Sequence, residues 1–163
     1  MVRAPIGCPV SAIERFVSEE AGWIEKQLAK QRRSALEAER EGTLTAADLK
    51  RLAERMRPFL EEKLPHYAAR IGVSFNRVTI RAQKSKWGSC TAGGNLNFNC
   101  LLMLAPEEVL DYVIVHELCH RKHMDHSPAF WAEVARILPD YQKPRKWLKE
   151  NGGILLARAR DGQ

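Results

Sequence analysis

The chain has 163 residues, of which 45% are hydrophobic, and carries a formal net charge of +6 with an isoelectric point near 9.3. These values suit one globular domain with a substantial core and exclude a largely disordered chain. No apolar run approaches the roughly 20 residues that cross a bilayer, and residues 1–5 lack the apolar stretch of a secretory signal, so we expect a cytoplasmic protein that does not enter a membrane. The positive charge permits binding to nucleic acid without requiring it, because many basic residues alternate with acids.

Cysteine usage indicates neither a disulfide framework nor a cysteine zinc site. No two of the four cysteines form a C-x-x-C pair. Cys119 is expected to be a small buried packing residue rather than a redox-sensitive thiol.

One long helix is predicted from Ser11 to near Gly42. The string Ser11-Ala12-Ile13-Glu14 has the pattern of a capping box, and the apolar residues after it recur at helical spacing. The basic run at residues 30–33 is followed at once by acids, which is typical of a solvated helix surface. Six apolar residues recur along this helix at helical spacing: Ile13, Phe16, Val17, Trp23, Ile24 and Leu28.

A second helix is predicted to begin at Thr45, because Thr45 and Asp48 have the spacing of an N-terminal cap. Pro58 and Pro65 are expected to kink or break it before Gly72. Its apolar residues again follow helical spacing: Leu49, Leu52, Met56, Phe59, Leu60 and Leu64.

From residue 73 the apolar period changes to that of strands. Residues 78–81 read as one strand, and residues 95–100 alternate polar and apolar with a period of two. Leu96, Phe98 and Cys100 are expected in the core, and three asparagines occupy the opposite face. This polar face indicates either an edge strand, to which an extended peptide could add beside the helix described below, or a hairpin strand wetted by solvent.

The segment between these strands is rich in glycine and is expected to be a loop. Trp87 gives this loop an unusually large apolar surface. Its side chain either anchors the loop to the core or forms a wall of a substrate cleft.

Residues 116–126 hold four of the five histidines of the chain, and His116, Glu117 and His120 form an H-E-x-x-H motif. On a helix, residues four apart share a face and lie about 6 Å apart along the axis, so two imidazoles can bind one Zn²⁺. Glu117 can reach a water on the metal without being a ligand, which suits a general base. The run before the motif is almost wholly apolar, so this helix is expected to be buried and to open at Pro106.

A third metal ligand must come from outside the helical pair. His123 would lie about 10 Å along the axis from His116 if the helix continued, too far to share the metal easily. His126 can reach the metal if the chain turns after about residue 122, and Ser127-Pro128 favours such a turn, as N-cap and first helical residue of a new helix. His126 also has the spacing of the third metzincin ligand, although His123 stands where metzincins have glycine. Glu133 on the next helix is the remaining alternative.

Two further helices are predicted near the end of the chain. The first runs from Ser127 to about Leu138. The second runs from about Lys143 to Glu150 and is expected to stop at residues 151–153, Asn-Gly-Gly.

Taken together, three segments resemble the YgjP-like metallopeptidase family, which is related to the SprT-like zinc metalloproteases. They are Ser85-Lys86-Trp87-Gly88-Ser89-Cys90, the run from Asp111 to His120, and His126-Ser127-Pro128-Ala129-Phe130-Trp131. The resemblance covers roughly residues 10–150. It implies an α+β, zincin-like fold, mostly helical with a small sheet beside the metal-binding helix. It also implies one Zn²⁺ bound by His116, His120 and His126, with Glu117 catalytic.

The resemblance also predicts the organisation of the chain. Residues 1–163 are expected to form a single YgjP-like metallopeptidase domain, with N-terminal helices over about residues 10–72 and strands plus the metal-site helices over residues 73–163. Members of the family usually carry additional β-rich sequence before the region at which this chain begins, so strands usual in the family are expected to be missing.

The leading functional hypothesis is a zinc-dependent peptidase acting on a peptide or protein. A first alternative is nucleoside triphosphate (UTP) pyrophosphatase activity, which has been linked with a YgjP-like protein, although no G-x-x-x-x-G-K-[ST] phosphate loop is present. A second alternative is a SprT-like protease or zinc module that associates with nucleic acid, for which the positive charge is the direct support.

Overall fold

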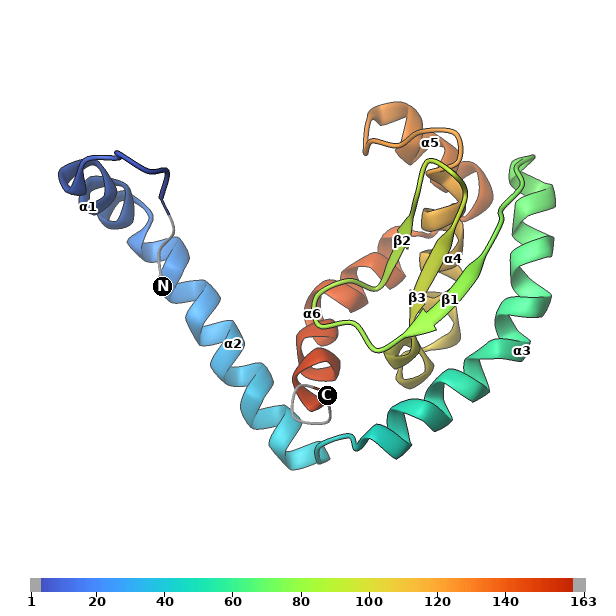
Figure 1. Cartoon of the computed structure of the whole chain (residues 1–163), viewed down its shortest axis with the longest axis horizontal. Helices are drawn as coiled ribbons and strands as arrows, with labels where there is room; N and C mark the ends of the chain where they lie inside the picture. Colours follow the sequence, from blue (N-terminus) through green and yellow to red (C-terminus); the bar gives the residue numbers. More distant parts are fainter. Residues whose placement is uncertain (1–3, 160–163) are drawn as a thin grey trace.

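The computed structural model describes residues 4–159, which form a mostly helical α+β fold with a small sheet (Figure 1). None of the helices in this range is long and apolar enough to span a membrane. In chain order the elements are α1 (Val10–Glu19), α2 (Ala21–Glu41), α3 (Ala46–Ile71), β1 (Val78–Arg81), β2 (Gly88–Cys90), β3 (Leu96–Asn99), the 3-10 helix η1 (Cys100–Leu104), α4 (Glu107–Cys119), α5 (Pro128–Ile137) and α6 (Gln142–Arg158).

The predicted N-terminal helix is two helices. Its course is interrupted at Glu20, just before Gly22, and glycine is a weak helix former. The helix begins at Val10 after Pro9 without a side-chain cap, so the predicted capping box at Ser11 was wrong. Phe16 and Trp23 are about 60% exposed, because α1 and the first half of α2 project away from the sheet and its covering helices (Figure 1).

The α3 helix begins at the predicted cap. Thr45 accepts from the backbone N–H of Asp48, and the Asp48 carboxylate accepts from the Thr45 N–H at 2.9 Å. The helix bends along its length but continues through Pro58 and Pro65 to Gly72 (Figure 1). The two prolines are seven residues apart on the exposed face, where the carbonyls that lose their helical hydrogen bonds can be solvated, so neither proline ends the helix.

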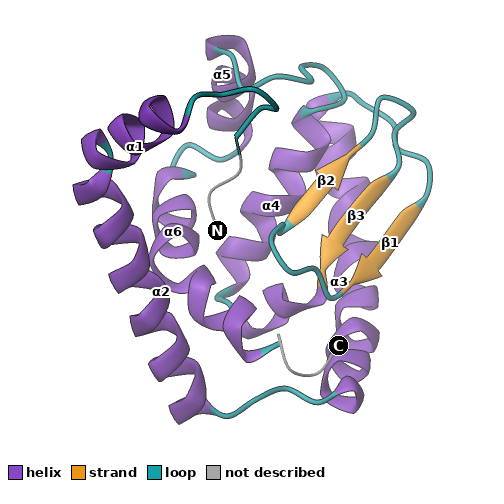
Figure 2. Cartoon of the chain, turned by 60° about the vertical axis from the view of Figure 1, so that its left-hand side comes forward, coloured by secondary structure: helices purple, strands orange, loops and turns teal. Residues whose placement is uncertain are grey.

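The sheet has the strand order β1-β3-β2, with β1 parallel and β2 antiparallel to β3 (Figure 2). Of the two alternatives considered for the asparagine-bearing strand, the edge position was wrong, because part of the glycine-rich loop forms β2 and makes β3 the central strand. The hairpin is present, because β2 and β3 pair antiparallel. Asn99 is fully buried and donates to the carbonyls of Gln83 and Lys86. Its polar side chain orders the loop before β2 instead of meeting solvent, and β2 becomes an edge of the sheet.

The core lies between the sheet and the helices packed around α4. The α4 helix is buried along most of its length, as its apolar sequence predicts, and contacts α3, α5, α6 and β2. The largest fully buried side chains come from α3, β3, η1, α4 and α5 and include Met56, Phe98, Leu101, Ile114 and Phe130. The metal-motif helix is thus held on several sides.

The last helix does not stop at the predicted Asn-Gly-Gly sequence, and α6 continues to Arg158. A Cβ at Gly152 would lie 2.8 Å from Cζ2 of Trp87, and one at Gly153 would lie 2.8 Å from Oγ of Ser34 on α2. The two glycines therefore allow close packing inside a helix rather than ending it.

Candidate metal centre

The two histidines of the H-E-x-x-H motif lie at the C-terminal end of α4. His116 is in its last turn, and His120 is the residue that closes the helix. The helix ends in a tight turn, in which the backbone N–H groups of Arg121 and Lys122 donate to the carbonyls of Leu118 and Cys119 at 3.0 Å each. The chain therefore reverses close to residue 122, where the sequence predicted it.

The turn brings His126 back to the helical pair. Its Nε2 lies 3.1 Å from Nε2 of His116, and its ring centroid is 4.8 Å from that of His120. The predicted Ser127 cap is present, because its hydroxyl accepts from the backbone N–H of Phe130 at 3.5 Å. One ligand nitrogen from each of the three histidines falls within 4.8 Å of the others, so the three side chains could hold one metal ion.

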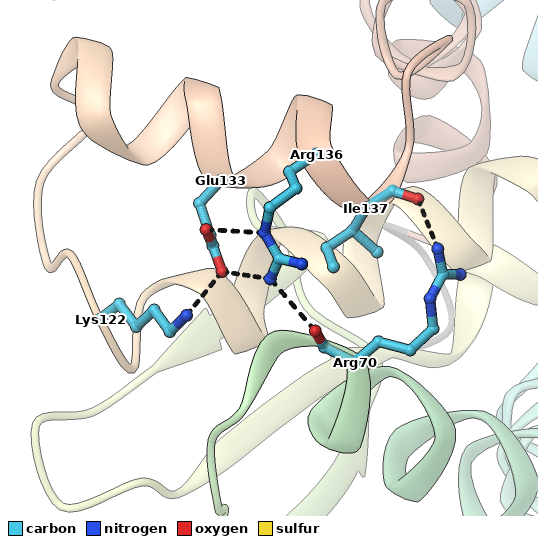
Figure 3. A network of polar contacts seen from close by, with 5 residues as sticks. All are labelled: Arg70, Lys122, Glu133, Arg136 and Ile137. Atoms are coloured by element: carbon cyan, nitrogen blue, oxygen red, sulfur yellow. Dashed lines mark hydrogen bonds and ion pairs between the residues drawn. The ribbon is translucent and has the colours of Figure 1, made fainter.

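Neither of the other two candidates joins this cluster. Glu133 instead pairs with Lys122 at 2.8 Å and with Arg136 at 2.7 Å (Figure 3). His123 contributes its backbone rather than its ring, since its carbonyl lies 3.0 Å from Nδ1 of His120. A proton on that Nδ1 leaves Nε2 of His120 free to bind a metal, an orienting role that spacing alone did not predict.

An aromatic layer surrounds the three imidazoles. The Phe130 ring centroid lies 4.6 Å from that of His120 and 4.9 Å from that of His116, and Trp131 stacks on His126 at 5.7 Å. Phe130 is fully buried, so it fixes the rings from the side of α5. The sequence alone did not predict that Phe130 packs on the histidines.

Tyr112 and Tyr141 continue this aromatic layer. Tyr112 lies 5.8 Å from His116 and stacks on Tyr141 at 6.4 Å between ring centroids. Burial raises the pKa of Tyr112 to about 12, so its phenol stays protonated at neutral pH. Tyr112 is buried and belongs to the core around α4.

Burial keeps the imidazoles of His116 and His120 neutral. It lowers the pKa of His116 to about 3, and the nearby His120, His126 and Arg145 act in the same direction. The pKa of His120 is also lowered, mainly by burial. A metal binds neutral imidazole, so no proton has to leave these two rings at neutral pH.

Glu117 is buried beside the histidines, with 5% of its surface exposed. Burial raises its pKa to about 8, and the positive charge of Lys86 opposes this rise. Gly88 of β2 lies directly against it, since a Cβ at Gly88 would be 2.5 Å from Oε1 of Glu117. The sequence showed a glycine in a loop there but not that it borders the glutamate.

A cavity of about 370 Å³ opens beside His116 and Glu117. Trp87 lies in its wall and also packs against the core and Gly152, so both roles considered for Trp87 are present. The other lining residues come from β2, the loop before it, α4 and α6: Lys86, Gly88, Tyr112, Val113, Arg145, Leu148 and Lys149.

The donor set fits a nitrogen-preferring transition-metal ion. Tetrahedral zinc holds imidazole nitrogens at about 2.0–2.1 Å, which places two such nitrogens about 3.4 Å apart. The 3.1 Å between the Nε2 atoms of His116 and His126 is close to that spacing. Two adjoining imidazole nitrogens and an adjacent carboxyl group match the composition of a hydrolytic metal centre.

Comparison with known proteins assigns the class of protein to which this chain belongs. A profile described as the YgjP-like metallopeptidase domain matches residues 43–151. The crystal structure of the metallopeptidase zymogen of Pyrococcus abyssi abylysin superposes with a TM-score of 0.50 at 25% sequence identity, covering 55% of this chain and 92% of that one. No curated protein matches the chain.

The fold and the histidine cluster thus define a zincin-like metallopeptidase. The chain belongs to the YgjP-like family, as its sequence motifs predicted. The matched region begins after α2, so α1 and α2 lie outside it. These comparisons support a peptide or protein substrate and give no support to the nucleotide or nucleic-acid alternatives.

Proposed function

We propose that this chain is a zinc-dependent peptidase in which His116, His120 and His126 bind one Zn²⁺ and Glu117 is the general base. The observation that carries the proposal is the convergence of three imidazoles beside a buried carboxyl group at the end of one helix. Zinc held there would act as a Lewis acid that polarises a carbonyl and lowers the pKa of water.

The protein's own residues would supply proton transfer and positioning. Glu117 is placed to accept a proton from the attacking water and to deliver it to the leaving amine. The His123 carbonyl and the Phe130 ring hold the imidazoles in place. Such support limits the movement of the ligands and keeps the donor nitrogens directed at one point.

The edge strand β2 offers a place for an extended peptide. Among the strands of residues 4–159, β2 pairs with β3 on one side only, so the backbone groups on its other side can pair with a substrate strand. Gly88 of β2 also lines the cavity beside Glu117, so a peptide added there would pass the proposed general base. The sequence offered the asparagine strand as one candidate for peptide addition; the position of β2 at the edge of the sheet supports β2 as the candidate instead.

The experiment compares wild type with Glu117→Gln. Purified wild type should carry about one zinc per chain and cleave an unstructured protein substrate. The Gln variant should retain the metal and lose at least about 10²-fold in turnover, since a positioned general base contributes about 10²–10⁴-fold. Glu133→Gln, on the neighbouring helix, is the matched control and should retain activity. Full activity in the Glu117 variant would refute the role of Glu117, and a wild-type protein that binds zinc but cleaves no peptide would refute the peptidase.

A further inference from the structure

Three cations surround the cavity beside Glu117. Lys86 precedes β2, and Arg145 and Lys149 stand one turn apart on α6. All three residues are exposed, and within residues 4–159 none of them forms an ion pair. The Arg145 guanidinium lies over the Trp131 ring at 4.2 Å, which positions its charge without neutralising it.

These cations are close enough to act on the proposed reaction centre. Lys86 and Arg145 line the same cavity as His116 and Glu117. A negatively charged group bound in the cavity would lie within the same electrostatic range.

The floor of the cavity is apolar. Trp87, Val113 and Leu148 line it, and Val113 is buried in α4. The cavity is therefore suited to an apolar side chain at its centre and to negative charge at its rim.

The cationic rim continues away from the site. Lys149 also lines a second cavity of about 890 Å³ between α2 and α6. There Arg33 is paired with Glu37 and Lys146 with Glu150, so these cations are largely balanced. Lys30, however, forms no ion pair in the described part of the chain and donates to the backbone carbonyl of Lys149 at 2.6 Å. A path of unbalanced positive charge thus leads from the proposed reaction centre toward α2.

We propose that this site selects peptide segments in which an apolar side chain is flanked by Asp or Glu. The inference rests on the proposed function and adds the substrate class. Unpaired cations beside a partly desolvated cavity attract carboxylates and disfavour basic segments through like-charge repulsion. A peptide is favoured over a nucleotide because the cavity has an apolar floor and borders the edge strand β2, which can pair with a peptide backbone.

The test uses three peptides that share one apolar centre and differ only in acidic, neutral or basic flanks. With zinc-loaded full-length protein, kcat/KM for the acidic peptide should exceed that for the neutral one by about tenfold at low salt, and the advantage should shrink as salt increases. Lys149→Glu should remove the preference or reverse it. Lys50→Glu makes the same change of charge on the exposed surface of α3 and should preserve it.

Binding gives a second readout that does not need turnover. Fluorescence anisotropy of the labelled peptides with the Glu117→Gln protein should show the same order of affinity. Adding Lys149→Glu to that variant should weaken binding of the acidic peptide by about tenfold. Lys86→Gln provides an independent variant in the loop and should reduce the same preference.

The outcomes separate this inference from the peptidase itself. If all three peptides are cleaved and bound equally, the inference fails while the peptidase stands. If none is cleaved but the acidic peptide binds best, the selectivity stands and the peptidase fails. Hydrolysis of nucleoside triphosphates without binding of the acidic peptide would overturn the inference and assign the cations to phosphate.

Discussion

Gly88 lies against Glu117 so closely that any larger residue at position 88 would enter the space of the carboxyl group. The Cβ of an alanine at position 88 would be 2.5 Å from Oε1 and 2.7 Å from Cγ of Glu117. β2, which carries Gly88, and α4, which carries Glu117, are thus in contact at the proposed reaction centre. The position of β2 sets the position of the carboxyl group.

Because of this contact, Gly88→Ala tests whether Gly88 determines the position of the Glu117 carboxyl group. The added methyl should displace Glu117 and lower kcat by at least about 10²-fold, because small misplacements of a catalytic group carry costs of this size. Zinc content should stay at the wild-type level, since the three histidines are not touched. Gly93→Ala is the matched control, because a Cβ there meets nothing nearer than Oγ1 of Thr91 at 3.9 Å. Equal activity of the two variants would show that the contact does not position Glu117.

The third ligand can be tested with two nearby histidines. His126→Ala should weaken zinc binding by at least about 10²-fold, because it removes one of three protein ligands. His123→Ala should bind zinc almost as wild type does, since the carbonyl that contacts His120 belongs to the backbone. Competition with a chromophoric chelator measures both affinities. Comparable losses in the two variants would contradict the assignment of His126.

The raised pKa of Glu117 predicts how the metal-free protein responds to pH. The pKa is about 8 in the folded chain against an ordinary value of 4.5, so the stability linked to its proton is complete below pH 4.5 and is lost as pH rises toward 8. Glu117→Gln removes this loss and should stabilise the metal-free protein by about 3 kcal/mol at pH 7, at 1.36 kcal/mol per pKa unit. Urea unfolding in the presence of EDTA, at pH 4.5 and pH 7, measures the difference.

Glu133→Gln should change the stability of the protein in the opposite direction to Glu117→Gln. Its ion pairs with Arg136 and Lys122 hold the pKa of Glu133 at about 2, so its contribution is present above pH 4.5 and is lost as pH falls through 2. The variant should therefore be less stable than wild type at pH 7. If both Gln variants shift stability in the same direction, burial is not what governs the charge of Glu117.

Gly152 and Gly22 test whether glycine in these helices serves packing. Gly152→Ala should destabilise the protein by about 1–3 kcal/mol, the usual cost of overpacking, because its Cβ would lie 2.8 Å from the Trp87 ring. Gly22→Ala adds the same methyl to exposed α2, where nothing lies within 4 Å, and should stabilise by about 0.5–1 kcal/mol. Thermal unfolding of the two variants is the measurement. A stabilised Gly152 variant would show that α6 can move away from Trp87 without cost.

The sequence predicted the parts that depend on local spacing. The reversal after His120, the Ser127 cap and the Thr45 cap each follow from residues within a few positions of one another. The edge position considered for the asparagine strand and the Asn-Gly-Gly stop were wrong because their outcome depends on distant partners. Asn99 is buried by the loop before β2, and Gly152 by Trp87 on that same loop.

By itself, the sequence predicted the donor set that we propose: the spacing of His116, Glu117 and His120, and a third histidine just before a Ser-Pro helix start. This is possible because helix geometry and capping are local and fix which side chains share a face. Only the tertiary structure decided that β2 is the edge strand, that Gly88 borders Glu117 and that cations from α6 surround the cavity. Those relationships join segments far apart in the chain, and they follow from how the buried apolar faces pack together rather than from any local pattern.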